Sequence, residues 1–375
     1  MWMSVLGATL PLPNSAFSVA AGHIFRVTAM DHFVRFISFY LLSAVLVACQ
    51  SGLPPTSPLA AQELSTANDQ PDFSATSQTT WAFQPLKDTY DRRSLLDLRD
   101  LNEAIAGEAG FVKLSADRES FVKGNGEPLR FWGVNINGKQ LTDQQLRDQA
   151  RFLAKRGVNL VRLHESLVPK TPEANFTDID PQTRERIWRT VAAMKQAGIY
   201  VTISPYWAQS VKPQPHWPVP KSSKNLSGLL FFNPELQTAY QAWWRALLEP
   251  VNPYTGIALK DDPVIAYFHL QNEDSLLFWT MQQLQGQDLN QLSEQYGQWL
   301  QQKYGSLVKA QAYWGKKATL PTDNLPSGRI SLYPIYELTK PINPNTDKGK
   351  RLADQTQFLT ETMAEFNQKM VKFLR

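Results

Sequence analysis

The stretch from Val264 to Ser275 constrains the fold of this chain more than any other. It begins with a nearly continuous apolar run, a pattern typical of a strand that is buried on both faces. Pro263 marks its start, because proline cannot continue a preceding helix. The run ends abruptly in Asn272, Glu273 and Asp274. The stretch therefore predicts a buried parallel strand with polar groups at its end. The alternative is that the two carboxylates only begin a loop and cap the next helix.

Extended and helical patterns alternate upstream of this stretch. We expect strands at 131–136, 159–164, 199–203 and 264–270, and helices around 142–153, 187–194 and 233–247. Thr142 and Gln145 form a capping box, and Asn233 precedes a proline in a first helical turn. This alternation is typical of βα units. It predicts an α/β fold, the N-terminal part of a (β/α)8 TIM barrel with about four βα units, preceded by a small β hairpin.

The region after the fourth predicted strand contains no convincing fifth strand, because Pro334 interrupts the alternation at 330–336. Helical segments follow at 292–304, 306–314 and 351–373. The last repeats an apolar residue every seven positions, which predicts a core face: Leu352, Leu359, Phe366 and Phe373. A full barrel needs eight strands, and a sheet of four leaves both edges unpaired. We therefore expect the domain at 129–375 to be incomplete at its C-terminus.

The N-terminal region has the composition of a targeting segment and a tether. Residues 36–48 are apolar, too short to span a bilayer and of the length of a signal-peptide core. They end in Leu-Val-Ala-Cys49, which looks like a bacterial lipobox. We expect Met30 to be the true start, residues 1–49 to be a lipoprotein signal segment, and Gln50 after the cysteine to favour the outer membrane. A plain signal peptide and an uncleaved anchor are the alternatives.

Residues 50–80 are rich in Ser, Thr, Pro, Ala and Gln, which predicts a flexible tether. Residues 81–128 are expected to form an N-terminal helix, at 95–106, and the hairpin. The net charge of +4 is small and no long Lys/Arg run occurs, so we expect no nucleic-acid partner. His164-Glu165-Ser166 belongs to no HExxH or GxSxG motif, so we expect no metal and no cofactor.

Three motifs together carry a resemblance to a known family: residues 131–135 (FWGVN), 159–164 (NLVRLH) and 271–273 (QNE). With these motifs in this order at strand ends, the chain resembles the clan A glycoside hydrolases, most closely glycoside hydrolase family 5, over roughly residues 110–314. The resemblance implies a retaining β-glycosidase that hydrolyses β-linked polysaccharides or oligosaccharides outside the cytoplasm. The family includes cellulases and mannanases, and the resemblance does not specify the sugar.

The resemblance also implies roles for individual residues. Glu273 would be the general acid/base, Asn272 would bind the sugar 2-hydroxyl, and Arg162 would lie beside the nucleophilic glutamate. That nucleophile belongs at the end of a seventh strand, so no residue of this chain receives the role. We accordingly expect the chain by itself to show no turnover. The second hypothesis is a surface lipoprotein that binds glycan without hydrolysing it.

Further polar and aromatic residues are candidates for substrate binding: His164, Asn135, Tyr206, Trp207, Trp217 and Trp279. Aromatic rings commonly pack against sugars, but core packing is an equally good explanation for each of them. Trp132 and His269 are expected in the core. The predicted binding partners are a carbohydrate and, through a lipid anchor at Cys49, a membrane.

Overall fold

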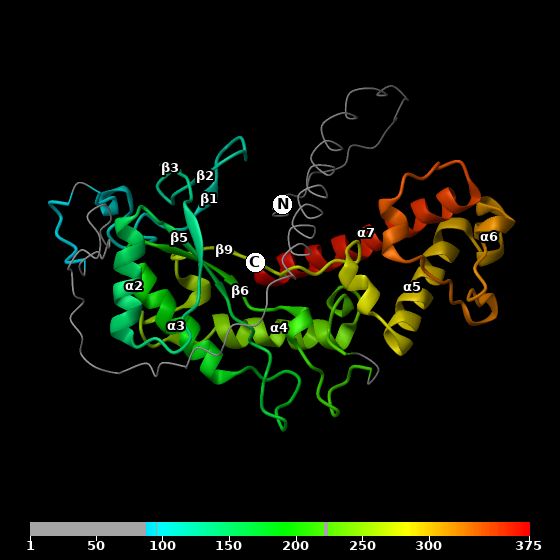
Figure 1. Ribbon diagram of the computed structural model, residues 1–375, viewed down its shortest axis with the longest axis horizontal. Helices are drawn as coiled ribbons and strands as arrows, with labels where there is room; N and C mark the ends of the chain where they lie inside the picture. The colour runs from blue at the N-terminus through cyan, green and yellow to red at the C-terminus, as the bar shows by residue number, and fades with distance from the viewer. Residues whose placement is uncertain (1–87, 95, 221–223) are drawn as a thin grey trace, which may run out of the picture. The chain divides into compact units, whose positions relative to one another are not determined.

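The computed structural model describes residues 88–94, 96–220 and 224–375 (Figure 1). The predicted signal segment, the start at Met30, the lipidation site Cys49 and the tether lie outside the described residues. None of the helices within the described ranges has the length and apolarity needed to cross a membrane.

The centre of the fold is a four-stranded parallel sheet in the order β4-β5-β6-β9. Its strands are β4 (Gly133–Ile136), β5 (Leu160–His164), β6 (Tyr200–Ser204) and β9 (Ile265–Phe268). They are joined by α2 (Asp143–Lys155), α3 (Pro181–Lys195) and α4 (Pro234–Leu248). The predicted α/β fold, with four strands alternating with helices, is confirmed. A short antiparallel ribbon between α4 and β9 was not predicted: β7 (Val251–Asn252) and β8 (Ile257–Ala258).

Local sequence accounts for where these helices begin. Thr142 accepts a hydrogen bond from the Gln145 amide and Gln145 bonds back, which confirms the predicted capping box of α2. Asn233 caps α4 in the same way, with proline in its first turn. Asp180 caps α3. Each cap satisfies N–H groups that the first helical turn leaves unpaired.

The two faces of the sheet have different chemistry. Helices α2, α3 and α4 lie on one side (Figure 1), where apolar side chains such as Val161, Val201 and Ile203 are completely buried. On the opposite face, one residue from each of the four strands pairs with its neighbour across the sheet, and together they form a polar row: Asn135, Arg162, Thr202 and Tyr267. This row belongs to the candidate site.

The predicted hairpin forms a three-stranded antiparallel sheet at the amino end of the polar face. Its strands are β1 (Lys113–Leu114), β2 (Phe121–Val122) and β3 (Pro128–Leu129). The ring of Phe121 lies 5.5 Å from that of Phe131 and 6.5 Å from that of Tyr267. The hairpin therefore packs against the start of β4 and against Tyr267 of the polar row.

Two predictions near the amino end were wrong. The helix expected at 95–106 is only the 3-10 turn η1 (Arg99–Leu101). Apart from its own 3-10 bonds, this segment bonds to the ends of other helices, through Leu98 N to Lys155 O at 3.0 Å and Ala106 N to Lys195 O at 2.9 Å. Trp132, expected in the core, is 68% exposed because it precedes the first residue of β4.

Three further helices follow the sheet: α5 (Gly286–Tyr304), α6 (Leu307–Trp314) and α7 (Asp347–Leu374). The predicted apolar stripe of α7 is confirmed, with Leu352, Leu359 and Phe366 at 2%, 0% and 1% exposure. The Phe366 ring lies 5.6 Å from Phe231 and 6.2 Å from Tyr240, so α7 packs against α4 and the 3-10 turn η3 (Leu229–Phe231). Within the described ranges no fifth strand joins the parallel sheet.

Candidate functional site

Polar side chains from all four parallel strands meet at one edge of the sheet. Because the strands are parallel, their carboxyl ends lie together, which is where ligands bind in parallel α/β folds. The Arg162 guanidinium in β5 is the centre of this group. Its Nη2 donates to Asn272 Oδ1 at 2.6 Å, across 110 residues of sequence. Two of the candidate site residues, Arg162 and Asn272, are thus in direct contact.

Three more neutral groups surround the same guanidinium. Arg162 donates to Asn135 Oδ1 at 3.3 Å and to Ser204 Oγ at 3.3 Å. It also contacts His269 Nδ1, at 3.3 Å from Nε and 3.2 Å from Nη2. Burial lowers the pKa of Arg162, but a guanidinium keeps its charge in proteins. Among the residues that the structure describes, no carboxylate forms an ion pair with Arg162, and its hydrogen-bond partners are neutral groups.

A β-bulge brings the last strand into this arrangement. The pairing of β6 with β9 shifts by one residue between Val201 and Thr202. Beyond the shift, Thr202 pairs with Tyr267, in the same row as Arg162. Bulges reorient the side chains that follow them and are common beside active sites. Here the bulge places Tyr267, and His269 two positions later, on the polar face.

Glu273 follows the sheet in an uncommon backbone conformation. Its φ is 48°, the left-handed region that non-glycine residues seldom adopt. Gln209 holds the turn by donating from Nε2 to the Glu273 carbonyl oxygen at 3.1 Å. The side chain is exposed, and its negative charge partly offsets the lowering by burial of the pKa values of Arg162 and His164. Strain of this kind concentrates at functional sites, and here it leaves an accessible carboxylate at the sheet edge.

His164 lies at the end of β5 beside this cluster. Its Nδ1 is 3.0 Å from Ser204 Oγ, and its ring is 5.7 Å from that of Trp207. Burial, followed by the charge of Arg162, lowers the pKa of His164. The neutral imidazole is therefore the favoured form. His164 and Trp207 thus form a half-buried wall of the site rather than part of the core.

The remaining aromatic candidates divide into two groups. Tyr206 is 1% exposed and Trp217 is 4% exposed, and the Trp217 indole N–H donates to Ala174 O at 3.2 Å. A buried ring has no face available for a sugar, so the prediction that these two bind substrate is corrected: both are core residues. Trp279 is 37% exposed, with the Phe278 ring 5.8 Å away. These two rings offer an exposed aromatic surface six residues beyond Glu273.

His269 was expected in the core, and the structure corrects this. It lies just after β9 and accepts a hydrogen bond from Arg162. Burial, with help from the positive charge of Arg162, lowers its pKa to about 4. The alternation of side chains between the two faces of the strand could have placed His269 on the polar face, but the bulge interrupts this alternation. Ser204 and Gln209 were also missed, because nothing in the sequence separates them from other polar residues after a strand.

We expect the imidazole of His269 to titrate with a midpoint of about 4 rather than at its ordinary value of 6.5. Because the folded protein then binds fewer protons than the unfolded chain between these values, this residue reduces stability as pH falls from 6.5 toward 4. NMR titration of the ring resonances measures the midpoint. Arg162→Ala should raise it, since a nearby positive charge is removed. A midpoint near 6.5 in the wild type would contradict the placement of His269 beside Arg162.

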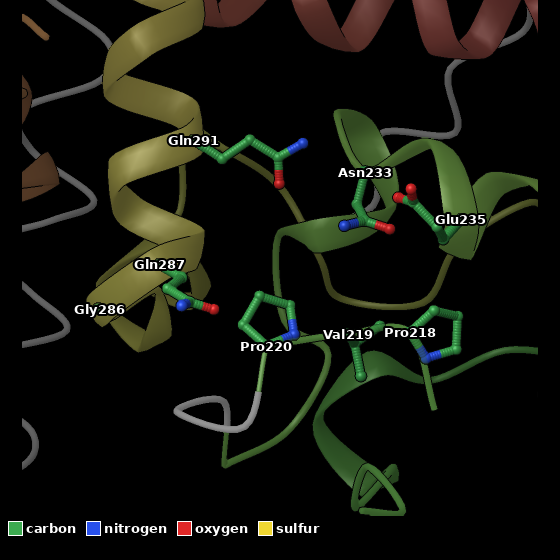
Figure 2. A pocket seen from close by; sticks show the side chains of 8 residues that line it. All are labelled: Pro218, Val219, Pro220, Asn233, Glu235, Gly286, Gln287 and Gln291. Carbon is green, nitrogen blue, oxygen red and sulfur yellow. The ribbon is translucent and has the colours of Figure 1, made fainter. Parts of the chain in front are cut away.

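A cavity of about 760 Å³ lies beside the first turns of α4 and α5. Figure 2 shows Gln287 and Gln291 extending from α5, with Asn233 and Glu235 at the start of α4. A proline-rich loop, Pro218–Pro220, forms the rest of the lining. None of the predicted site residues lines this cavity, and it is wide and open. The cluster around Arg162 is therefore the better-organised candidate site.

Comparisons with known proteins give structural matches only. No family model matches the chain, and a search of curated proteins finds no match. The endo-1,4-β-mannanase of Rhizomucor miehei matches with a TM-score of 0.34 and 16% identity, over 45% of this chain and 50% of that one. The family 5 mannosidase of Rhizomucor miehei matches with a TM-score of 0.35 and 18% identity, over 44% of this chain and 49% of that one. The endo-β-1,4-mannanase of Thermotoga petrophila matches with a TM-score of 0.31 and 17% identity, over 48% of this chain and 41% of that one.

The chain therefore spans about half the length of the solved structures it matches. Two of these structures are mannanases and one is a mannosidase.

Proposed function

We propose that the cluster around Arg162 is the acid/base half of the active site of a retaining β-glycosidase acting on a β-linked polysaccharide or oligosaccharide. The observation that carries the proposal is the 2.6 Å contact from Arg162 to Asn272. It joins two strand ends of the polar face and fixes the amide immediately before Glu273.

The chemistry assigned to Glu273 is that of a general acid that later acts as a base. In retaining hydrolysis one carboxylic acid protonates the glycosidic oxygen as the bond breaks, and a second carboxylate forms the covalent glycosyl intermediate. The first group then takes a proton from the water that attacks this intermediate. An exposed carboxylate at the sheet edge is accessible for both steps.

Asn272 is suited to a sugar hydroxyl because of the way Arg162 holds it. Its Oδ1 accepts from the guanidinium, which directs the Nδ2 donors away from Arg162. An amide whose orientation is fixed in this way can donate to the 2-hydroxyl, a contact that strengthens in the transition state. Within the described chain the hydrogen-bond partners of Arg162 are neutral, so its positive charge is available to stabilise the second carboxylate, the nucleophile. No residue is assigned as that nucleophile.

Oligosaccharide binding tests this proposal. We expect β-1,4-linked manno- or gluco-oligosaccharides to bind the protein, and Asn272→Ala to weaken binding by about tenfold through the loss of one buried hydrogen bond. Isothermal titration calorimetry measures both affinities, and Asn345→Ala, at an exposed loop position, is the matched control. No binding, or equal affinities for Asn272→Ala and the wild type, would contradict the proposal.

A second candidate is glycan binding without hydrolysis, and the exposed pair Phe278 and Trp279 favours it. Aromatic faces bind sugar rings without any catalytic group. Both candidates place the sugar at the same edge of the sheet. They differ in whether Glu273 takes part in hydrolysis of the bound sugar.

The protein is also proposed to be exported and anchored by a lipid at Cys49, with the bacterial outer membrane or cell surface as its location. The support is the apolar segment and the Leu-Val-Ala-Cys motif. We expect Cys49→Ser to abolish incorporation of labelled palmitate and to release the protein from the membrane fraction, whereas Ser51→Ala changes neither. Palmitate labelling that persists in Cys49→Ser would contradict this location of the anchor.

A further inference from the structure

Asp274 makes an unusual contact directly after Glu273. Both of its carboxylate oxygens lie 3.0 Å from the backbone N–H of Gly228, which donates to them. Gly228 has φ 74°, a conformation natural to glycine, and it begins the η3 turn. A bond from this backbone N–H to the residue after Glu273 therefore ties the loop before α4 to the end of β9.

A second set of bonds holds the other side of the same turn. The Ser275 N–H donates to Thr280 Oγ1 at 3.2 Å, and Thr280 Oγ1 donates to the Ser275 carbonyl oxygen at 3.0 Å. Thr280 is completely buried. Together with the bond from Gln209 to the Glu273 carbonyl oxygen, these contacts fix the backbone on both sides of Glu273.

We propose that Asp274 is a positioning residue for Glu273: by accepting from Gly228, its carboxylate holds the left-handed turn that presents the Glu273 side chain at the sheet edge. This deepens the proposed function, since it takes Glu273 as the acid/base. Asp274 itself is half-buried and is directed to Gly228 rather than to a substrate. The contact is therefore with the scaffold, and its effect on chemistry passes through Glu273.

The hydrogen bonding of the Gly228 N–H to the Asp274 carboxylate, called the clamp below, depends on the charge of Asp274. Burial raises the pKa of Asp274 to about 6, against the opposing effect of the Gly228 hydrogen bond. Its surroundings are the Gly228 N–H, the Thr280 hydroxyl, the Ser275 N–H and the Tyr206 phenol, whose own pKa burial raises well above its ordinary value. Across the described ranges, no Lys, Arg or His forms an ion pair with Asp274. Protonation converts one of the two acceptor oxygens into a donor and weakens the clamp.

Amide hydrogen exchange of the 375-residue protein tests this. In the wild type we expect the protection factor of the Gly228 amide to rise about tenfold from about pH 5 to about pH 7, because hydrogen bonds to a charged acceptor are the stronger ones. The midpoint should lie at about 6. Glu273, Asp274 and Ser275 amides should follow the same profile. Asp274→Asn should make the profile flat, and Asp274→Ala should remove the protection at all pH values.

Asp261→Ala, an exposed aspartate on the 3-10 turn before β9, is the matched control and should keep the wild-type profile. Asp274→Asn retains shape and one acceptor, so it guards against a result caused by misfolding. A wild-type profile independent of pH, or unchanged protection at 273–275 in Asp274→Ala, would overturn the proposal. These readouts need no sugar, so failure of oligosaccharide binding would count against the proposed function and leave the clamp to be judged separately.

Discussion

Glu273→Gln is expected to lower kcat for a β-linked oligosaccharide by about 10²- to 10⁴-fold, which is the usual contribution of general acid–base catalysis. Glutamine preserves the shape of the side chain but cannot donate a proton to the glycosidic oxygen. The assay is steady-state hydrolysis by the host-expressed protein, because the 375-residue chain by itself is expected to show no turnover. Activated aryl glycosides, whose leaving groups need little protonation, should be affected much less in the bond-breaking step.

Glu294→Gln, on the exposed side of α5, is the control for this experiment and should leave kcat unchanged. Oligosaccharide affinity should be similar for Glu273→Gln and the wild type, because the acid/base acts mainly in the transition state. Equal turnover by Glu273→Gln and the wild type would remove Glu273 from the chemistry. Oligosaccharide binding without turnover by either protein would favour the non-catalytic glycan-binding hypothesis.

Arg351→Ala is expected to destabilise the protein by about 3–5 kcal/mol, the cost of leaving one partner of a buried ion pair uncompensated. The Arg351 and Asp323 side chains are 0% and 1% exposed. They form two bonds, of 2.7 Å and 2.6 Å. Arg351 also donates to the carbonyl oxygens of Ala318 and Ser331, both at 2.6 Å. The pair thereby fastens α7 to the irregular segment between α6 and α7.

Urea unfolding at constant pH measures this loss. The double variant Arg351→Met with Asp323→Leu should recover part of it, because replacing a whole buried pair by apolar groups is often neutral or stabilising. Lys316→Ala, at an exposed position whose side chain has no described hydrogen bond, should change stability by less than about 0.5 kcal/mol. A loss below about 1 kcal/mol for Arg351→Ala would mean that water or another group compensates Asp323.

The elements whose signals are local were predictable from the sequence. Thr142 with Gln145 and Asn233 with its following proline specified helix starts, and the strand at β5 follows from its apolar alternation. The residues at the centre of the site, Arg162 and Asn272, came from their positions at strand ends and from the family resemblance. Their mutual contact follows from the parallel order of the strands, which brings distant strand ends to one edge.

The errors arose where tertiary contacts decide the outcome. Tyr206 and Trp217 follow strand and loop patterns that suit a binding site, but both are buried. The Tyr206 ring packs 5.6 Å from Tyr240 of α4, and the Trp217 ring packs 4.9 Å from Phe176. His269 was misplaced because the bulge before it shifts the alternation by one residue. The segment at 95–106 has helical spacing, yet it keeps only a 3-10 turn, and two of its backbone N–H groups donate to the ends of α2 and α3.

The structure of the protein with a bound β-linked oligosaccharide would test the central claim most directly. We expect the glycosidic oxygen within hydrogen-bonding reach of the Glu273 carboxyl group, about 2.6–3.2 Å, and the 2-hydroxyl of the adjoining sugar on Asn272 Nδ2. A ring stacked on Trp279 would agree with this placement. An oligosaccharide bound instead in the cavity beside Gln287 and Gln291, with Glu273 out of reach, would contradict it.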